Sequence, residues 1–164
     1  MTLRIDGTLL LAGAGNMGLA MLAGWLERGL DPRCIVVQDP NPPARARELM
    51  QEHGIDLRSA VGSMREPPAV LVVAIKPQAM DAVFPALAQL ARKSTLVLSV
   101  AAGRTIDGFE RHLPKGTAVV RSMPNTPASI GRGITAAAAN THVTAAQRAT
   151  CDALLRAVGE VVWV

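Results

Sequence analysis

Ala12-Gly13-Ala14-Gly15-Asn16-Met17-Gly18 is the stretch of this sequence that decides the fold. An apolar run, residues 8–11, comes directly before it, and a helix-like run, residues 19–28, comes directly after it. A strand, a tight G-x-G-x-x-G turn and a helix in this order are typical of a unit that binds a dinucleotide.

The three glycines of this turn have separate expected roles. Gly13 permits the sharp turn, and Gly15 lets the backbone approach a pyrophosphate without an intervening Cβ atom. Gly18, on which the helix is expected to open, lets the helix lie close to the strand. The helix N-terminus then offers free N–H groups to the phosphates. The alternative is a glycine turn that serves only helix–strand packing.

The rest of the chain alternates strand and helix patterns, with no internal repeat. Residues 69–75 form a continuous apolar run, as expected for a central parallel strand covered on both faces. The alternation predicts an α/β fold of Rossmann-like type: a doubly wound, mainly parallel sheet with helices on both faces. Further strands are expected at 34–38, 55–58, 95–100, 117–123, 134–139 and 160–164, and further helices at 44–53, from 77, at 106–112 and at 145–158.

Composition narrows the class of protein. A length of 164 residues predicts one domain, and a hydrophobic content of 49% argues against disorder. No apolar run reaches the roughly 20 residues of a membrane span, and no signal-peptide pattern is present, so a cytoplasmic protein without a membrane partner is expected. The net charge of +4 is scattered and aromatic residues make up only 2%, so no nucleic-acid partner is expected.

Several kinds of catalytic site have no support in the sequence. There is no tyrosine, and the three histidines lie in predicted loops or helix ends without partner residues, so no catalytic residue is identifiable. No C-x-x-C or H-E-x-x-H pattern exists, and no metal site is expected. Cys34 and Cys151 are expected to pack as small hydrophobic residues.

Asp39 ends the second predicted strand, where an acidic residue accepts the adenosine ribose hydroxyls of a dinucleotide. A carboxylate there favours NAD because it repels a 2′-phosphate. Asn41, Arg45 and Arg47 follow closely, however, and a guanidinium can pair with that phosphate. The two signals conflict, and Asp39 has the alternative interpretation of a turn residue before Pro40.

Three further segments end predicted strands on the same edge of the sheet, where ligands bind in such folds. Lys76 and Pro77 follow the central strand, Ala101-Ala102-Gly103 follows the next, and Asn125 lies in a turn with two prolines. Each has an alternative: a solvated lysine before a helix-initiating proline, ordinary loop packing, and an Asx turn.

Four blocks together resemble the pyrroline-5-carboxylate reductase family. They are Leu11-Ala12-Gly13-Ala14-Gly15-Asn16-Met17-Gly18, Ala74-Ile75-Lys76-Pro77-Gln78, Ser99-Val100-Ala101-Ala102-Gly103 and Arg121-Ser122-Met123-Pro124-Asn125-Thr126-Pro127. The last block is far more specific than the glycine turn.

The resemblance implies a domain that binds NADP or NAD, with NADP preferred, and that delivers hydride to the C=N carbon of 1-pyrroline-5-carboxylate to give L-proline. Asn125 would stand near the nicotinamide and the imine substrate. The implied cofactor-binding residues are Gly13, Ala14, Gly15, Asn16, Met17 and Gly18 at the pyrophosphate, Asp39 and Asn41 at the ribose, and Ala74, Lys76, Pro77, Val100, Ala101 and Ala102 along the nicotinamide half.

Members of that family are longer, with a helical C-terminal domain that forms the dimer and contributes to the substrate site. The apolar run 160–164 at the end of this sequence suggests that such a domain is missing, or else that a buried terminal strand ends the fold. On the first interpretation, residues 1–164 are the cofactor domain. This chain alone is then expected to bind cofactor but to reduce the imine poorly, and a homo-oligomer is expected for the full-length protein through the missing domain.

Two other functions stay open. One is another reductase with the same N-terminal fold, such as a deazaflavin-dependent NADP reductase or a 3-hydroxyacid dehydrogenase. The other is a module that senses NAD(P) without catalysis, which would keep the glycine turn but need not keep Lys76 or Asn125.

Overall fold

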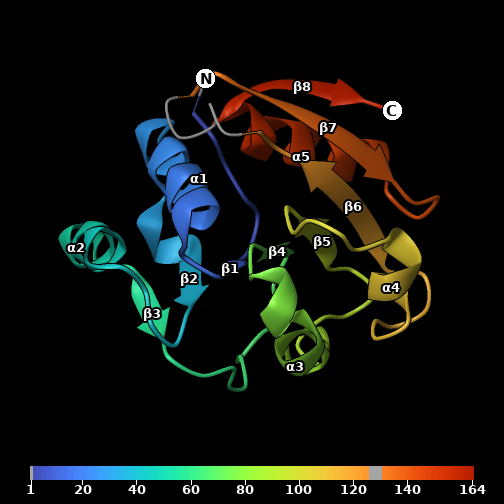
Figure 1. The fold of residues 1–164 in the computed structure, drawn as a ribbon, viewed down its shortest axis with the longest axis horizontal. Helices are drawn as coiled ribbons and strands as arrows, with labels where there is room; N and C mark the ends of the chain where they lie inside the picture. The colour runs from blue at the N-terminus through green and yellow to red at the C-terminus, as the bar shows by residue number, and fades with distance from the viewer. Residues whose placement is uncertain (1, 126–130) are drawn as a thin grey trace.

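The computed structural model describes residues 2–125 and 131–164. Its strands form one eight-stranded sheet in the order β3-β2-β1-β4-β5-β6-β7-β8 (Figure 1). Neighbouring strands run parallel, except that β7 runs antiparallel to β6. The strands are β1 (Leu9–Ala12), β2 (Ile35–Gln38), β3 (Asp56–Arg58), β4 (Val70–Val73), β5 (Leu96–Ser99), β6 (Ala118–Met123), β7 (Gly133–Ala139) and β8 (Gly159–Trp163).

Helices cover both faces of the sheet, which confirms the predicted doubly wound, mainly parallel α/β fold. The apolar side chains of α1, α2 and α5 pack on one face, and those of α3 and α4 pack on the other. Strands β1, β2, β4 and β5 are fully buried, as continuous apolar runs between two helix layers require. The helices are α1 (Asn16–Glu27), α2 (Ala44–His53), α3 (Pro77–Ala88), α4 (Ile106–Glu110) and α5 (Ala145–Arg156), with a short 3-10 turn, η1 (Pro32–Cys34).

Close contact between α1 and α5 holds the last part of the chain to the first. The indole Nε1 of Trp25 donates to the carbonyl oxygen of Leu154 at 3.0 Å. A Cβ atom added to Gly24 would lie 2.7 Å from the carbonyl oxygen of Ala157, so only glycine fits between the two helices. Strands β7 and β8 lie beyond β6 in the same sheet and run opposite to the other six strands (Figure 1).

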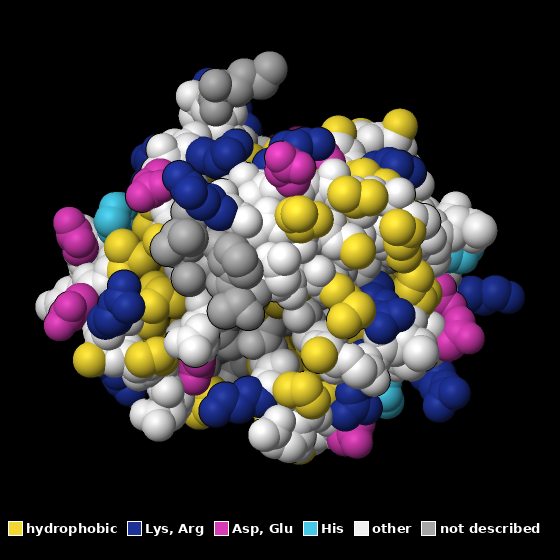
Figure 2. Space-filling view, turned by 45° about the horizontal axis from the view of Figure 1, so that its top comes forward, with side chains coloured by type: hydrophobic (Ala, Val, Ile, Leu, Met, Phe, Trp, Pro, Cys, Tyr) yellow, Lys and Arg dark blue, Asp and Glu magenta, His cyan; other side chains and the backbone are white. Residues whose placement is uncertain are grey.

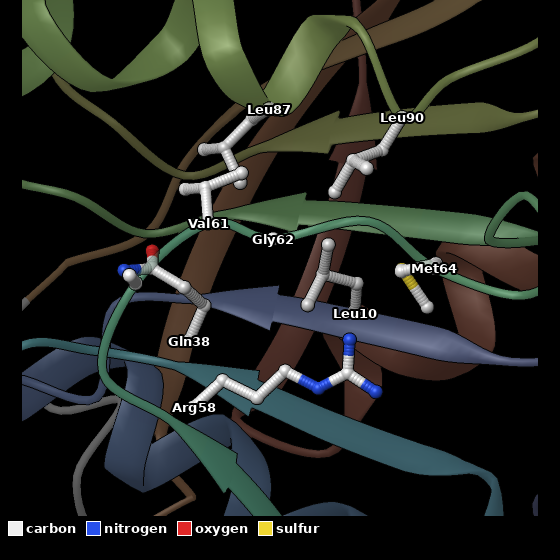
Figure 3. A pocket seen from close by; sticks show the side chains of 9 residues that line it. Leu10, Gln38, Arg58, Val61, Gly62, Met64, Leu87 and Leu90 are labelled. Atoms are coloured by element: carbon white, nitrogen blue, oxygen red, sulfur yellow. The ribbon is translucent and has the colours of Figure 1, made fainter.

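The connection from β3 to β4, residues 59–69, contains no helix or strand. It lies over the sheet beside α3 and covers a small pocket, with a free volume of about 10 Å³, against the side chains of Leu10 and Leu87 (Figure 3). Gln38 and Arg58, at the ends of β2 and β3, close one side of the pocket. A loop thus replaces the crossover helix that usually covers this part of such a sheet.

Large apolar side chains are exposed at the end of β6 and along β7 and β8. The large hydrophobic side chains that are exposed among the described residues all belong to this region, and hydrophobic side chains gather there in Figure 2. They are Met123, Ile134, Val162 and Val164. No helix among the described residues is long and apolar enough to cross a membrane.

Both cysteines are free, and Cys151 packs in the core as predicted. Burial raises the pKa of the Cys151 thiol to about 12, so the thiol stays protonated at neutral pH. Burial also raises the pKa of Cys34, which is half-buried at the end of η1.

Candidate dinucleotide-binding site

The glycine turn joins β1 to α1 at the carboxyl edge of the sheet. Gly13 adopts a φ of +98°, which a side chain would strain, and its N–H donates to the carbonyl oxygen of Gln38 at 2.8 Å. A Cβ on Gly18 would lie 2.1 Å from the carbonyl oxygen of Gly13. The expected turn and the expected close approach are therefore both present, and Ala14 is buried beneath them.

The helix begins earlier than predicted. Gly15 is the N-cap and α1 starts at Asn16, not on Gly18 as the sequence pattern suggested. The prediction was wrong because the bend is complete at Gly13, and the chain is free to enter the helix two residues later. Gly18 therefore lies in the first turn, with Asn16 exposed and Met17 half-buried before it.

Open space lies in front of Gly15. Apart from Gly15 and its two chain neighbours, no described residue would come within 4 Å of a Cβ placed there, and the φ of −72° is accessible to any residue. The fold itself therefore does not require glycine at this position. A ligand whose atoms approach the backbone would require it.

The helices that follow β1, β2 and β4 lack side-chain caps. Neither the N-cap of α1, Gly15, nor that of α2, Pro43, nor that of α3, Lys76, accepts a backbone hydrogen bond through its side chain. By contrast, Thr105 and Thr144 cap α4 and α5. The first turns of α1 to α3 also contain no acidic residue, so their N–H groups and positive helix ends are available to phosphate oxygens.

Asp39 connects the glycine turn to the loop after β2. Its Oδ2 accepts the N–H of Ala14 and its Oδ1 accepts the N–H of Asn41, both at 2.8 Å. The second bond is the local turn that the alternative interpretation described. A carboxylate has about four acceptor positions, so ribose hydroxyls can still be accepted, and the ribose role of Asp39 and Asn41 stays a prediction.

Two arginines beside this loop differ in their contacts. The Nε of Arg47 donates to the carbonyl oxygen of Pro42 at 3.1 Å and so holds the loop. Arg45 is exposed in the first turn of α2. Both side chains are exposed, and Arg47 differs in that its Nε is held by the loop.

The ends of β4 and β5 lie next to the glycine turn. The N–H of Ala74 donates to the carbonyl oxygen of Ala12 at 2.8 Å, and a Cβ on Gly13 would meet the carbonyl oxygen of Ala74. Pro77 begins α3 as predicted, with the exposed Lys76 before it. On the next strand, the N–H of Val100 donates to the carbonyl oxygen of Val73 at 3.0 Å.

Small residues follow β5. Ala101 is buried, whereas Ala102 and Gly103 are exposed at the edge. The N–H of Ala101 donates to the Oγ of Ser99 at 3.1 Å, and the hydroxyl of Ser122 donates to the carbonyl oxygen of Ser99 at 2.7 Å. Sequence reasoning gave these two buried serines no role. Their only signal was their place at strand ends inside the blocks quoted above.

Asn125 is exposed just after β6, and its Oδ1 accepts the N–H of Ile134 at 2.9 Å. Its side chain therefore connects the end of β6 to the start of β7. This contact reaches beyond the local Asx turn that the alternative interpretation described. Thr126 and Pro127 of the same block lie outside the described residues. The role of Asn125 toward a substrate stays a prediction.

Parallel strands bring the predicted residues to one edge of the sheet, from β2 through β1, β4 and β5 to β6. None of them lines the small pocket of Figure 3. Among the described residues, no three His, Cys, Asp or Glu side chains are grouped to hold a metal ion. The arrangement suits an extended anionic ligand that lies along the edge with its phosphates at α1.

Comparison with known proteins identifies the class to which this fold and edge belong. The chain belongs to the family described as NADP oxidoreductase, coenzyme F420-dependent, whose model matches residues 8–103. More particularly, it is a homologue of the N-terminal NADP-binding domain of pyrroline-5-carboxylate reductases, which confirms the resemblance seen in the sequence.

Individual relatives give the extent of the similarity. The pyrroline-5-carboxylate reductase of Pseudomonas aeruginosa is 37% identical over 152 residues, covering 93% of this chain and 55% of that protein. The structure of the Coxiella burnetii enzyme superposes with a TM-score of 0.84 at 29% identity, over 98% of this chain and 59% of that one. The structure of Plasmodium falciparum pyrroline carboxylate reductase with NADP bound superposes with a TM-score of 0.80, over 97% of this chain and 58% of that one. Its sequence identity to this chain is 19%, so this likeness shows the fold alone.

The chain spans about half the length of the curated relatives it matches. The similarity to those relatives nevertheless continues past residue 103, where the family model ends, because an alignment over 93% of the chain must also take in β6 and β7.

Proposed function

We propose that this chain is the cofactor-binding part of a pyrroline-5-carboxylate reductase, which reduces 1-pyrroline-5-carboxylate to L-proline with NADPH. The observation that carries the proposal is the open space in front of Gly15, next to the uncapped N-terminus of α1. Because the fold does not need glycine there, a ligand that approaches the backbone accounts for it. A cytoplasmic location accompanies this proposal.

Bound NADPH would supply the hydride that reduces the C=N carbon of the imine. The N–H groups at the start of α1 bind the pyrophosphate, and Asp39 fixes the loop at the adenosine end through Ala14 and Asn41. The segments after β4 and β5, with Ala74, Lys76, Pro77, Val100, Ala101 and Ala102, face the nicotinamide half. Asn125 lies farthest along the edge, toward the imine.

NADP is the favoured cofactor within this proposal. Both oxygens of Asp39 already accept backbone N–H groups, which partly neutralises the carboxylate toward a neighbouring phosphate. Arg45 is exposed at the uncapped start of α2, where a 2′-phosphate would find both a guanidinium and free N–H groups. The Plasmodium falciparum structure is an NADP complex of the same fold.

A second candidate is the F420-dependent NADP reduction that the family description includes. The similarity to the curated reductases over 93% of the chain, including the block around Asn125, favours the imine. Incubation with each substrate and NADPH separates the two, because consumption of NADPH with F420 but not with the imine would reverse the assignment. A non-catalytic NAD(P) sensor would reduce neither.

The direct test is the variant Gly15→Ala. Its Cβ meets open space, so the free energy of unfolding should change by less than about 0.5 kcal/mol, since a weaker N-cap and a less flexible unfolded chain oppose each other. NADPH affinity, measured by fluorescence titration, should fall about tenfold or more, equivalent to roughly 1.4 kcal/mol. Unchanged affinity would contradict the proposal.

Gly18→Ala is the matched control. Its Cβ would collide with the carbonyl oxygen of Gly13, so the variant should lose about 1–3 kcal/mol of stability in urea unfolding. The two glycines therefore separate a ligand requirement from a packing requirement.

Turnover by the 164-residue chain alone should be slow, since the relatives contain nearly as much chain again. Near-equal rates for this chain and a full-length relative, measured under the same conditions, would show that the substrate site is complete here. In that case the proposed role as cofactor domain only would be wrong.

A further inference from the structure

Two buried serines join β5 to β6 at the carboxyl edge of the sheet. Ser99 is the last residue of β5 and is fully buried, and Ser122 on β6 is 1% exposed. The Ser122 hydroxyl donates to the carbonyl oxygen of Ser99 at 2.7 Å. Buried hydroxyls are costly to desolvate, so a pair of them at this edge requires a structural or functional reason.

The pair controls the segment that leaves β5. The Oγ of Ser99 accepts the N–H of Ala101 at 3.1 Å, and so fixes the backbone two residues beyond the strand. The N–H of Val100 is bound to β4 through the carbonyl oxygen of Val73. The turn that carries Ala102 is therefore held from β4 on one side and, through Ser99 and Ser122, from β6 on the other.

A second buried hydroxyl makes similar hydrogen bonds at the opposite end of β5. The Oγ1 of Thr95, also fully buried, accepts the N–H of Arg92 at 3.0 Å and donates to the carbonyl oxygen of Pro68 at 2.8 Å. Both ends of β5 thus carry buried hydroxyl contacts, but only those of Ser99 and Ser122 adjoin the proposed cofactor edge. Thr95 provides the natural control for stability alone.

We propose that Ser99 and Ser122 are positioning residues which hold the turn at Ala101 and Ala102 for the nicotinamide half of the dinucleotide. The inference rests on the proposed binding of NADPH. The serines do not touch the cofactor; they act through the backbone of Ala101. Their loss should therefore weaken contacts at one half of the ligand and leave the other half unaffected.

The test compares two ligands on three variants. NADPH carries both halves, whereas 2′-phospho-ADP-ribose has the adenosine half without nicotinamide. Ser99→Ala and Ser122→Ala should each weaken NADPH binding by roughly fivefold, the loss typical of one hydrogen bond. Their affinity for 2′-phospho-ADP-ribose should be that of the wild type. Thr95→Val should lower the melting temperature and leave the affinity for both ligands unchanged.

Ser122→Thr keeps the hydroxyl and should restore the ratio of the two affinities. The inference is overturned if both ligands weaken equally in the serine variants, if Thr95→Val changes the ratio as much, or if the wild-type chain binds the two ligands with equal affinity. Wild-type chain that binds neither ligand would instead overturn the proposed function itself.

Discussion

Asp39 serves two segments at once. Its carboxylate connects the glycine turn with the loop after β2, through Ala14 and Asn41. The contact with Asn41 is local, and the alternative interpretation as a turn residue anticipated it. The contact with Ala14 joins residues 25 positions apart, and no local pattern contains it. Sequence reasoning therefore located the residue but not its main partner.

Replacement of Asp39 by asparagine should separate the charge of this residue from its hydrogen bonds. The amide keeps one acceptor oxygen for the loop but no longer repels a 2′-phosphate. NADPH affinity should rise relative to NADH affinity by roughly fivefold, corresponding to about 1 kcal/mol of electrostatic repulsion.

Asp31→Asn makes the same change of charge before η1, away from the glycine turn, and should leave the ratio of NADPH to NADH affinity unchanged. Equal ratios in the wild type and both variants, from parallel titrations, would show that Asp39 does not discriminate between the cofactors.

Helix α5 illustrates which contacts of an element are readable in a sequence. Its capping box, in which Thr144 and Gln147 bond to each other's backbone N–H, is local, and the spacing of these two residues indicates it in the sequence. The contacts by which the helix packs against β8 cannot be read from the sequence in this way. The Nε1 of Trp163 donates to Oδ1 of Asp152 at 3.0 Å, and the guanidinium of Arg148 lies 4.4 Å from the centre of the Trp163 ring. These partners depend on how strand and helix pack.

The free energy of unfolding at acid pH should depend on the charge of Asp152. Burial raises the pKa of Asp152, but the hydrogen bonds from Trp163 and Arg156 outweigh burial and hold the pKa below the ordinary 3.8. A carboxyl group with a lowered folded pKa stabilises the fold above its unfolded pKa. That contribution is lost as pH falls through the folded pKa.

Asp152→Asn should therefore cost about 1 kcal/mol at neutral pH. The difference from the wild type should shrink toward zero as the pH falls below 3.8, in urea unfolding followed by tryptophan fluorescence. Stability curves that stay parallel down to acid pH would show that the charge of Asp152 contributes nothing.

At the scale of the whole molecule, periodicity predicted nearly every element and the α/β class. It did not predict strand order or direction. The segment 134–139 was expected as a strand, but nothing in its alanine-rich sequence indicates that it runs antiparallel to β6. The α1–α5 contact is likewise not readable locally, because the hydrogen bond from Trp25 to Leu154 joins residues 129 positions apart. Pairing over such distances is set by tertiary packing.

Gly24→Ala should therefore loosen the last third of the molecule selectively. The added Cβ would lie 2.7 Å from the carbonyl oxygen of Ala157, and relief of that clash requires α5 to move away from α1. A loss of about 1–3 kcal/mol is expected. Hydrogen exchange should accelerate most in β7, α5 and β8, while β1, β4 and β5 keep their protection. Uniform acceleration would show that α5 does not open independently.

The loop between β3 and β4 makes this chain a convenient scaffold for grafting. Residues 59–69 contain no regular secondary structure, and Arg65, Glu66 and Pro67 are exposed at the surface. The cost of closing a longer loop grows only with the logarithm of its length, by about 0.6 kcal/mol for each doubling. A peptide epitope or a fluorescent reporter inserted at Glu66 would therefore leave the glycine turn intact.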